Sequence, residues 1–134
     1  MSVQRVLVVD DDAHIRQVIR LALSKAGFDV LEAGDGGEAF KVLGTGVTRG
    51  EVCTIICDLQ MPSVDGNQAI PYFHARYPEI PLVILTGAPD FILTEALQKE
   101  GICAYLQKPV SNAKLIEVIR QTARLSELRK TSAP

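Results

Sequence analysis

Acidic side chains follow two apolar runs of this sequence, and they are the residues best placed to do chemistry. Asp10 and Asp11 come directly after VLVV, and Asp58 comes directly after TIIC. If both runs are strands of one parallel sheet, their carboxyl ends meet at one rim, where such sheets bind ligands. Carboxylates brought together there repel one another, and a hard divalent cation is the usual remedy. Mg²⁺ fits this set and suits phosphoryl transfer, with Asp58 as the nucleophile.

A hydroxyl and an ammonium group end two further apolar runs. Thr86 closes IPLVILT, and Lys108 follows ICAYLQ. A transferred phosphoryl group carries charge on several oxygens, so a lysine and a hydroxyl near Asp58 would complete such a site. Plainer interpretations exist for each residue: a turn for Asp58 and Thr86, a helix cap for the acidic triplet, a solvated strand end for Lys108. Their joint occurrence at the ends of four strands favours a site.

Hydrophobic periodicity predicts five strands that alternate with five helices. Short apolar runs predict strands at residues 3–9, 28–33, 52–58, 80–86 and 102–106. Apolar positions three and four residues apart predict helices from Asp12 to Gly27, over residues 35–43, from Asp65 onward, over residues 89–100 and from Ser111 to about Lys130. Asp65 with Gln68 resembles a capping box, but Pro71 should kink the third helix or delay its start.

This alternation predicts one α/β domain built on a doubly wound parallel sheet. Right-handed crossovers place helices on both faces of such a sheet. The 134 residues suit a single domain with a core over residues 3–122. The last helix should turn four side chains inward, namely Leu115, Val118, Ile119 and Thr122. Residues 123–134 form a helix extension and tail, where Leu125 and Leu128 predict a dimer contact, the start of a linker or a frayed end.

Composition and charge exclude several classes of function. Hydrophobic residues make up 47% of the chain and charged residues 22%, which is typical of a globular protein. A formal net charge of −2 predicts no general attraction to nucleic acid or anionic lipid. No apolar run approaches the roughly 20 residues that span a bilayer, and the three cysteines suit reduced thiols, so we expect a cytoplasmic protein.

Four motifs occur in a specific order: VLVVDDD, IICDLQMPSVDG, VILTGA and YLQKP. With them the chain resembles the receiver domains of bacterial two-component response regulators, of the chemotaxis-regulator-like kind, from Val3 to about Thr122. The resemblance implies a flavodoxin-like sheet with the strand order 2-1-3-4-5. It also implies a phosphoprotein of a signal-transduction phosphorelay, in which Asp58 takes a phosphoryl group from a histidine kinase or a histidine phosphotransfer protein.

The resemblance assigns roles to individual residues. The metal ligands that it implies, for Mg²⁺ or Mn²⁺, are Asp10, Asp11, Asp58 and the backbone carbonyl of Gln60. It implies that Thr86 and Lys108 meet the phosphoryl oxygens and that Tyr105 is the switch aromatic. Four loop positions of the family's pattern are also present, namely Pro62, Gly66, Gly87 and Pro109.

By this resemblance the chain is a phosphoacceptor signalling domain rather than an enzyme, and it promotes only its own phosphorylation and dephosphorylation. Movement of Thr86 toward the phosphoryl group would leave space for Tyr105 to turn inward. The face around the fourth helix, including Phe91 and Ile92, would then change its affinity for a downstream protein or a fused output domain. A homodimer is a further expected partner, whereas direct binding to nucleic acid or to a membrane is not expected.

Three other interpretations compete with this one. A phosphatase with an aspartate nucleophile needs a second aspartate two residues later, where this chain has Gln60. A flavodoxin would bind a phosphate in its first loop, which residues Asp10 to Asp12 would repel. The remaining alternative is a receiver-like protein-interaction module that is not phosphorylated.

Overall fold

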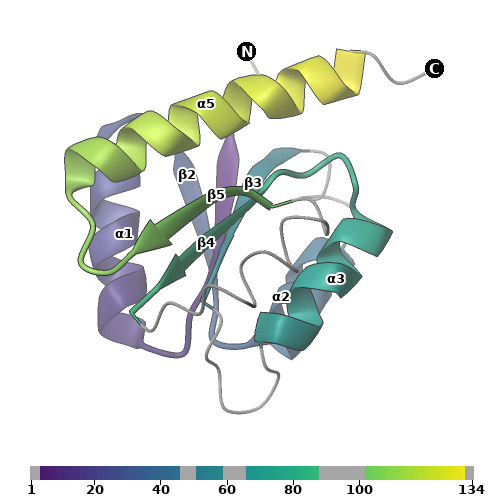
Figure 1. Ribbon diagram of the computed structural model, residues 1–134, viewed down its shortest axis with the longest axis horizontal. Helices are drawn as coiled ribbons and strands as arrows, with labels where there is room; N and C mark the ends of the chain where they lie inside the picture. Colours follow the sequence, from purple (N-terminus) through teal and green to yellow (C-terminus); the bar gives the residue numbers. More distant parts are fainter. Residues whose placement is uncertain (1–3, 46–50, 59–65, 88–101, 132–134) are drawn as a thin grey trace.

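The computed structural model describes residues 4–45, 51–58, 66–87 and 102–131, which form a layered α/β structure (Figure 1). The strands are β1 (Arg5–Val9), β2 (Asp29–Ala33), β3 (Val52–Cys57), β4 (Leu82–Thr86) and β5 (Ile102–Gln107). The helices are α1 (Ala13–Lys25), α2 (Gly36–Leu43), α3 (Gly66–Arg76) and α5 (Asn112–Thr131). The predicted helix over residues 89–100 lies outside the described residues.

The strands of the described residues form one parallel sheet in the order β2-β1-β3-β4-β5. This confirms the doubly wound, flavodoxin-like fold and places all five carboxyl ends at one rim. Two apolar residues predicted to begin strands, Phe28 and Ile80, are buried just before them. Their backbone N–H groups donate to Leu23 O and Tyr77 O, each at 3.0 Å, so they close the preceding turns instead of extending the sheet.

Helices cover both faces of the sheet, with α1 and α5 on one side and α2 and α3 on the other (Figure 1). Alternate residues of β1 divide between the two cores. Val6 and Val8 pack with side chains of α1 and α5, whereas Leu7 and Val9 pack with those of α2 and α3. Burial on both faces explains why the central strands β1, β3 and β4 are nearly continuous apolar runs in the sequence, whereas the edge strands β2 and β5 are only partly buried.

Pro71 lies inside α3, which runs from Gly66 to Arg76. The predicted delay of the helix start is therefore wrong. Ile70 and Phe73, on either side of the proline, are fully buried in the core beside α2. Their burial offsets the lost backbone hydrogen bond and the clash that a proline causes in a helix interior.

Helix α5 begins as predicted, because the Ser111 hydroxyl accepts a hydrogen bond from the Lys114 N–H at 3.1 Å. The four side chains predicted to face the core are buried, namely Leu115, Val118, Ile119 and Thr122. The extension beyond Thr122 also packs on the body, since Ala123 and Ser126 are buried and Glu127 accepts a hydrogen bond from Gln4 at 3.0 Å. No helix in the described ranges is long and apolar enough to cross a membrane.

Candidate functional site

Carboxylates from two neighbouring strand ends meet at the rim of the sheet. Val9 and Cys57 are the last paired residues of β1 and β3, so Asp10 and Asp58 emerge side by side. Asp10 is 3% exposed and Asp58 is 7% exposed, whereas the neighbouring Asp11 is exposed to solvent. One oxygen atom from each of the three carboxylates lies within 4.8 Å of the others. The rim therefore concentrates negative charge in a largely buried position.

Asp12, the third aspartate of the triplet, has a different role. Its side chain caps α1 by accepting hydrogen bonds from the N–H groups of His14 and Ile15, at 2.9 and 3.4 Å. Its own N–H donates to Asp10 Oδ1 at 2.9 Å. The interpretation of the triplet as a helix cap thus holds for Asp12 alone.

Lys108 reaches the carboxylates from the end of β5. Its Nζ atom lies 2.8 Å from Asp10 Oδ2 and 2.8 Å from Asp58 Oδ2. Burial lowers the pKa of Lys108, but the hydrogen bonds to the two carboxylates outweigh it and raise the pKa above its ordinary value. Lys108 is therefore an ammonium ion that bridges both buried carboxylates.

The charge of Asp10 is only partly compensated. Burial raises the pKa of Asp10, and its hydrogen bonds to Lys108 and to the Asp12 N–H offset this effect only in part. Among the described residues, one ammonium group faces three carboxylates, so the site still attracts a cation. Its oxygen ligands are the kind that Mg²⁺ and Mn²⁺ prefer.

Thr86 and Tyr105 lie on the same face of the sheet, toward α2 and α3. Ile84 belongs to the core on that face, and Thr86, two residues further along β4, shares its orientation. Tyr105 pairs in register with Ile84 and packs against the same core, and Thr86 is fully buried. The Tyr105 hydroxyl is buried without a hydrogen-bond partner among the described residues. The hydroxyl and the aromatic ring of the predicted switch are thus on neighbouring strands and on one face.

Comparisons with known proteins agree with this geometry. Residues 6–120 match the family described as the response regulator receiver domain. The chain belongs to this family. It is 27% identical over 124 residues to the C4-dicarboxylate transport transcriptional regulatory protein DctD of Pseudomonas aeruginosa, covering 92% of this chain and 26% of that protein. It is 30% identical over 132 residues to a putative response regulator, NtrX-like, of Rickettsia bellii, covering 97% of this chain and 27% of that protein.

Solved structures of receiver domains share the fold. A response regulator receiver domain protein of Clostridium thermocellum has a TM-score of 0.86 and 28% identity, covering 94% of this chain and 98% of that one. The signal receiver domain of an HD domain-containing protein from Pseudomonas fluorescens has a TM-score of 0.90 and 27% identity, covering 99% of this chain and 96% of that one. The chain spans about a quarter of the length of the two curated relatives named above.

The other predicted positions of the receiver domain are distributed as follows. Gly87 is exposed beside the Lys108 side chain, and Pro109 is exposed after a cis peptide bond. Gly66 begins α3. Gln60 and Pro62 lie outside the described residues.

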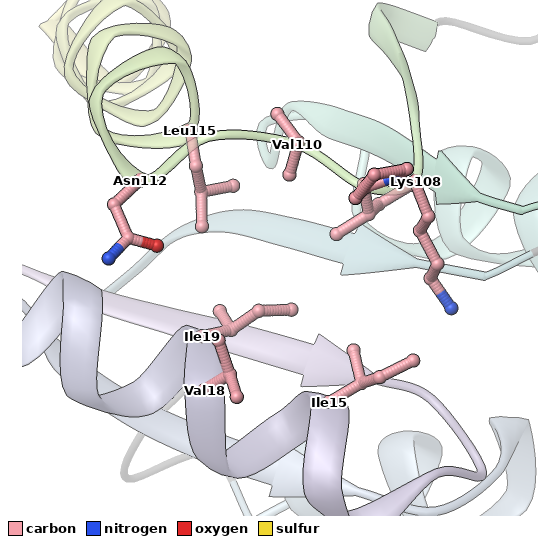
Figure 2. A pocket seen from close by; sticks show the side chains of 9 residues that line it. Ile15, Val18, Ile19, Lys108, Val110, Asn112 and Leu115 are labelled. Carbon is pink, nitrogen blue, oxygen red and sulfur yellow. The ribbon is translucent and has the colours of Figure 1, made fainter.

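An apolar pocket of about 430 Å³ adjoins the receiver site, between α1 and the start of α5 (Figure 2). Ile15 and Ile19 of α1 face Val110 and Leu115 across it. Lys108 lies at its edge, so the aliphatic part of this side chain meets apolar neighbours while the ammonium group meets carboxylates. The pocket was not apparent from the sequence, because its walls come from distant segments.

Sequence reasoning also missed a residue of α1 that touches the site. Arg16 Nη1 donates a hydrogen bond to the backbone oxygen of Asp10 at 2.6 Å. A single arginine on the polar side of a helix is ordinary in sequence. The one sequence signal is the position of Arg16, which lies one helical turn after the capping Asp12. At that position its side chain can reach back to the end of β1.

Proposed function

We propose that this receiver domain accepts a phosphoryl group on Asp58. The observation that carries the proposal is the pairing of a nearly buried carboxylate at the end of β3 with two further carboxylates and the ammonium group of Lys108. In the reaction, an Asp58 oxygen forms a bond to phosphorus while the bond from phosphorus to a donor nitrogen breaks. The electron pair of that bond stays with the donor, a histidine imidazole.

The cation for this step is Mg²⁺ or Mn²⁺, and the carboxylates of Asp10, Asp11 and Asp58 would hold it. Three carboxylate oxygens within 4.8 Å of one another suit such an ion. Gln60 would add its backbone carbonyl, as the family pattern implies. When bound, the cation neutralises negative charge on the carboxylates and on the phosphoryl oxygens.

Two further side chains, those of Lys108 and Thr86, would bind the phosphoryl oxygens. Lys108 now bridges Asp10 and Asp58, and it would transfer its Asp58 contact to a phosphoryl oxygen once that carboxylate becomes an acyl phosphate. Thr86 would donate its hydroxyl to another phosphoryl oxygen from the end of β4. The burial of Asp58 limits the access of water to the product.

The signalling partners follow from the same proposal. A histidine kinase or histidine phosphotransfer protein would supply the phosphoryl group, and a downstream protein or a fused output domain would respond to it. Two matched relatives are described as a transcriptional regulatory protein and a response regulator, which fits such an output. We propose residues 1–134 as one cytoplasmic receiver domain, with its core over residues 3–122, that acts as a phosphoacceptor rather than an enzyme.

Incubation with a small-molecule phosphodonor and Mg²⁺, followed by intact-mass measurement, tests the proposal. The unaltered protein should gain one phosphoryl group, and Asp58→Asn should gain none. Asp12→Asn is the matched control, because it removes a charge from the same rim and keeps a good helix cap. Phosphorylation of Asp58→Asn would show that another residue accepts the phosphoryl group and would overturn the assignment to Asp58. An unaltered protein that gains no mass would favour the interaction module that is not phosphorylated.

A further inference from the structure

The backbone carbonyl of Asp10 lies beyond the last residue pair of the sheet. β1 ends at Val9, whose partners are Ala33 on one side and Cys57 on the other. The Asp10 N–H still donates to Ala33 O at 3.1 Å, but within the part of the chain that the structure describes the strand pairing does not extend to the Asp10 carbonyl. A buried backbone carbonyl needs a donor, and here the donor is Arg16 Nη1 at 2.6 Å.

Arg16 is itself held in place by a carboxylate. Its Nε lies 3.1 Å from Glu32 Oε1 on β2, and the Arg16 side chain is 19% exposed. Arg20, one turn further along α1, also pairs with Glu32, at 2.8 Å, and donates to the Val30 carbonyl at 3.2 Å. Both arginines therefore join α1 to β2, but only Arg16 also bonds the backbone of Asp10.

The contact fixes the peptide plane between Asp10 and Asp11. These two residues carry two of the three clustered carboxylates, and the orientation of their shared peptide sets the directions in which both side chains leave the backbone. Glu32 pairs with both Arg16 and Arg20 and so offsets only one of their two positive charges; a pure charge effect of Arg16 would therefore weaken cation binding at the site.

We propose that Arg16 is a positioning residue for the divalent cation, with Glu32 as its counter-charge. Arg16 touches neither the cation nor the phosphoryl group. It holds the Asp10 carbonyl so that the two aspartates present their oxygens together with Asp58. The inference rests on the proposed function, since it needs a cation at the acidic cluster.

Mg²⁺ titration of the unphosphorylated protein, read by a binding isotherm, tests the proposal without any phosphoryl transfer. Arg16→Lys keeps the charge but lacks the fork that reaches two acceptors, and it should weaken Mg²⁺ binding about tenfold. The double variant Arg16→Met with Glu32→Gln keeps the net charge and should weaken binding similarly. Arg20→Met is the matched control, and its dissociation constant should stay within about twofold of the unaltered protein.

Other roles for Arg16 give different results. If Arg16 acted only through its charge, Arg16→Lys would bind Mg²⁺ normally and Arg16→Met would bind it more tightly. If it only joined α1 to β2, Arg20→Met would weaken binding as much as Arg16→Lys does. Either result would overturn the positioning role and leave the proposed function intact. An unaltered protein that binds no Mg²⁺ would overturn both the positioning role of Arg16 and the proposed function. Urea unfolding of each variant confirms that the titrated protein is folded.

Discussion

The negative charge of the carboxylates at the rim is only partly neutralised by the described side chains. Lys108 bonds one oxygen of Asp10 and one of Asp58, yet burial still raises the pKa of Asp10. Asp11 adds a third carboxylate within 4.8 Å. Residues that crowd like charges in a buried place reduce stability and are typical of functional sites. Removal of one of these charges should therefore stabilise the protein when no cation is present.

The first prediction concerns Asp10→Asn, which keeps an oxygen acceptor for the Asp12 N–H. Without Mg²⁺, we expect this variant to raise the free energy of unfolding at pH 7 by on the order of 1 kcal/mol. Mg²⁺ at ten times its dissociation constant should stabilise the unaltered protein by about 1.4 kcal/mol and the variant by much less. Urea unfolding with and without Mg²⁺ measures both effects.

The gain in stability expected for Asp10→Asn should depend on pH. Because the folded pKa of Asp10 is raised, its contribution to stability is greatest below its unfolded pKa of about 3.9 and is lost as the pH rises through the folded value. The advantage of Asp10→Asn should therefore shrink on acidification. An Asp10→Asn protein less stable than the parent at pH 7 would show that the bond to Lys108 outweighs burial.

At the scale of elements, the sequence predicts what is locally encoded. Strands buried on both faces form apolar runs that need no knowledge of their partners. Gly27 ends α1 with a φ of 95°, a backbone conformation that favours glycine and that the sequence signals directly. Pro71 is the counterexample, because its place inside α3 depends on the burial of Ile70 and Phe73 against other elements. Local propensity cannot predict such tertiary compensation.

The site shows the same division. Asp10, Asp58 and Lys108 could be predicted because each directly follows a strand, and parallel strands bring their ends together. The capping role of Asp12 is local, because its side chain accepts hydrogen bonds from two N–H groups at the start of the same helix. The contact of Arg16 with the Asp10 carbonyl depends on how α1 packs over the rim, and periodicity carries no information about it.

Helix α5 supplies the prediction at this scale, because its last turns are part of the domain's own packing. The Thr122 hydroxyl lies 2.6 Å from that of Thr54 on β3, and Ala123 and Ser126 continue the buried side. Truncation after Thr122 should lower the free energy of unfolding by about 2 kcal/mol, since it removes buried side chains. Chemical denaturation measures the loss, and an unchanged midpoint would favour a frayed end.

Leu128, which is 60% exposed, is the matched control and tests the predicted dimer contact. Leu128→Glu should change stability by no more than about 0.5 kcal/mol, as expected for a surface position. Sedimentation of the unaltered protein and of Leu128→Glu reports the oligomeric state. A dimer that dissociates in the variant supports the contact, and two monomers with the same sedimentation exclude it.

At the scale of the whole molecule, both residues of the predicted switch lie on one side of the sheet. Thr86 and Tyr105 face α2 and α3, on neighbouring strands β4 and β5. Strand β5 is an edge strand of the described sheet, so a change at Tyr105 occurs at that edge. Helices α1 and α5 cover the opposite face. We therefore expect a signal from Asp58 to leave through β5, while Phe91 and Ile92 of the predicted output face lie outside the described residues.

The last prediction tests this route with Thr86→Ala. Phosphorylation of Asp58 should persist, because Lys108 and the carboxylates are unchanged, but the change in partner affinity should shrink. Such a switch operates only if the phosphoryl group stabilises one conformation over the other, and about 1.4 kcal/mol is needed for each tenfold shift in population. Intact mass measures the modification, and a binding isotherm for the output partner, before and after phosphorylation, measures the switch.

Tyr105→Phe is the control that separates the ring of this residue from its hydroxyl. The hydroxyl has no hydrogen-bond partner among the described residues, so its loss should leave the switch intact, because the ring alone fills the space that Thr86 would vacate. Tyr105→Ala, which removes the ring, should weaken the switch as Thr86→Ala does. If phosphorylation of the Thr86→Ala variant still changed partner affinity fully, the signal would have to be transmitted through the end of another strand. In that case the route would run through β3, which directly precedes Asp58.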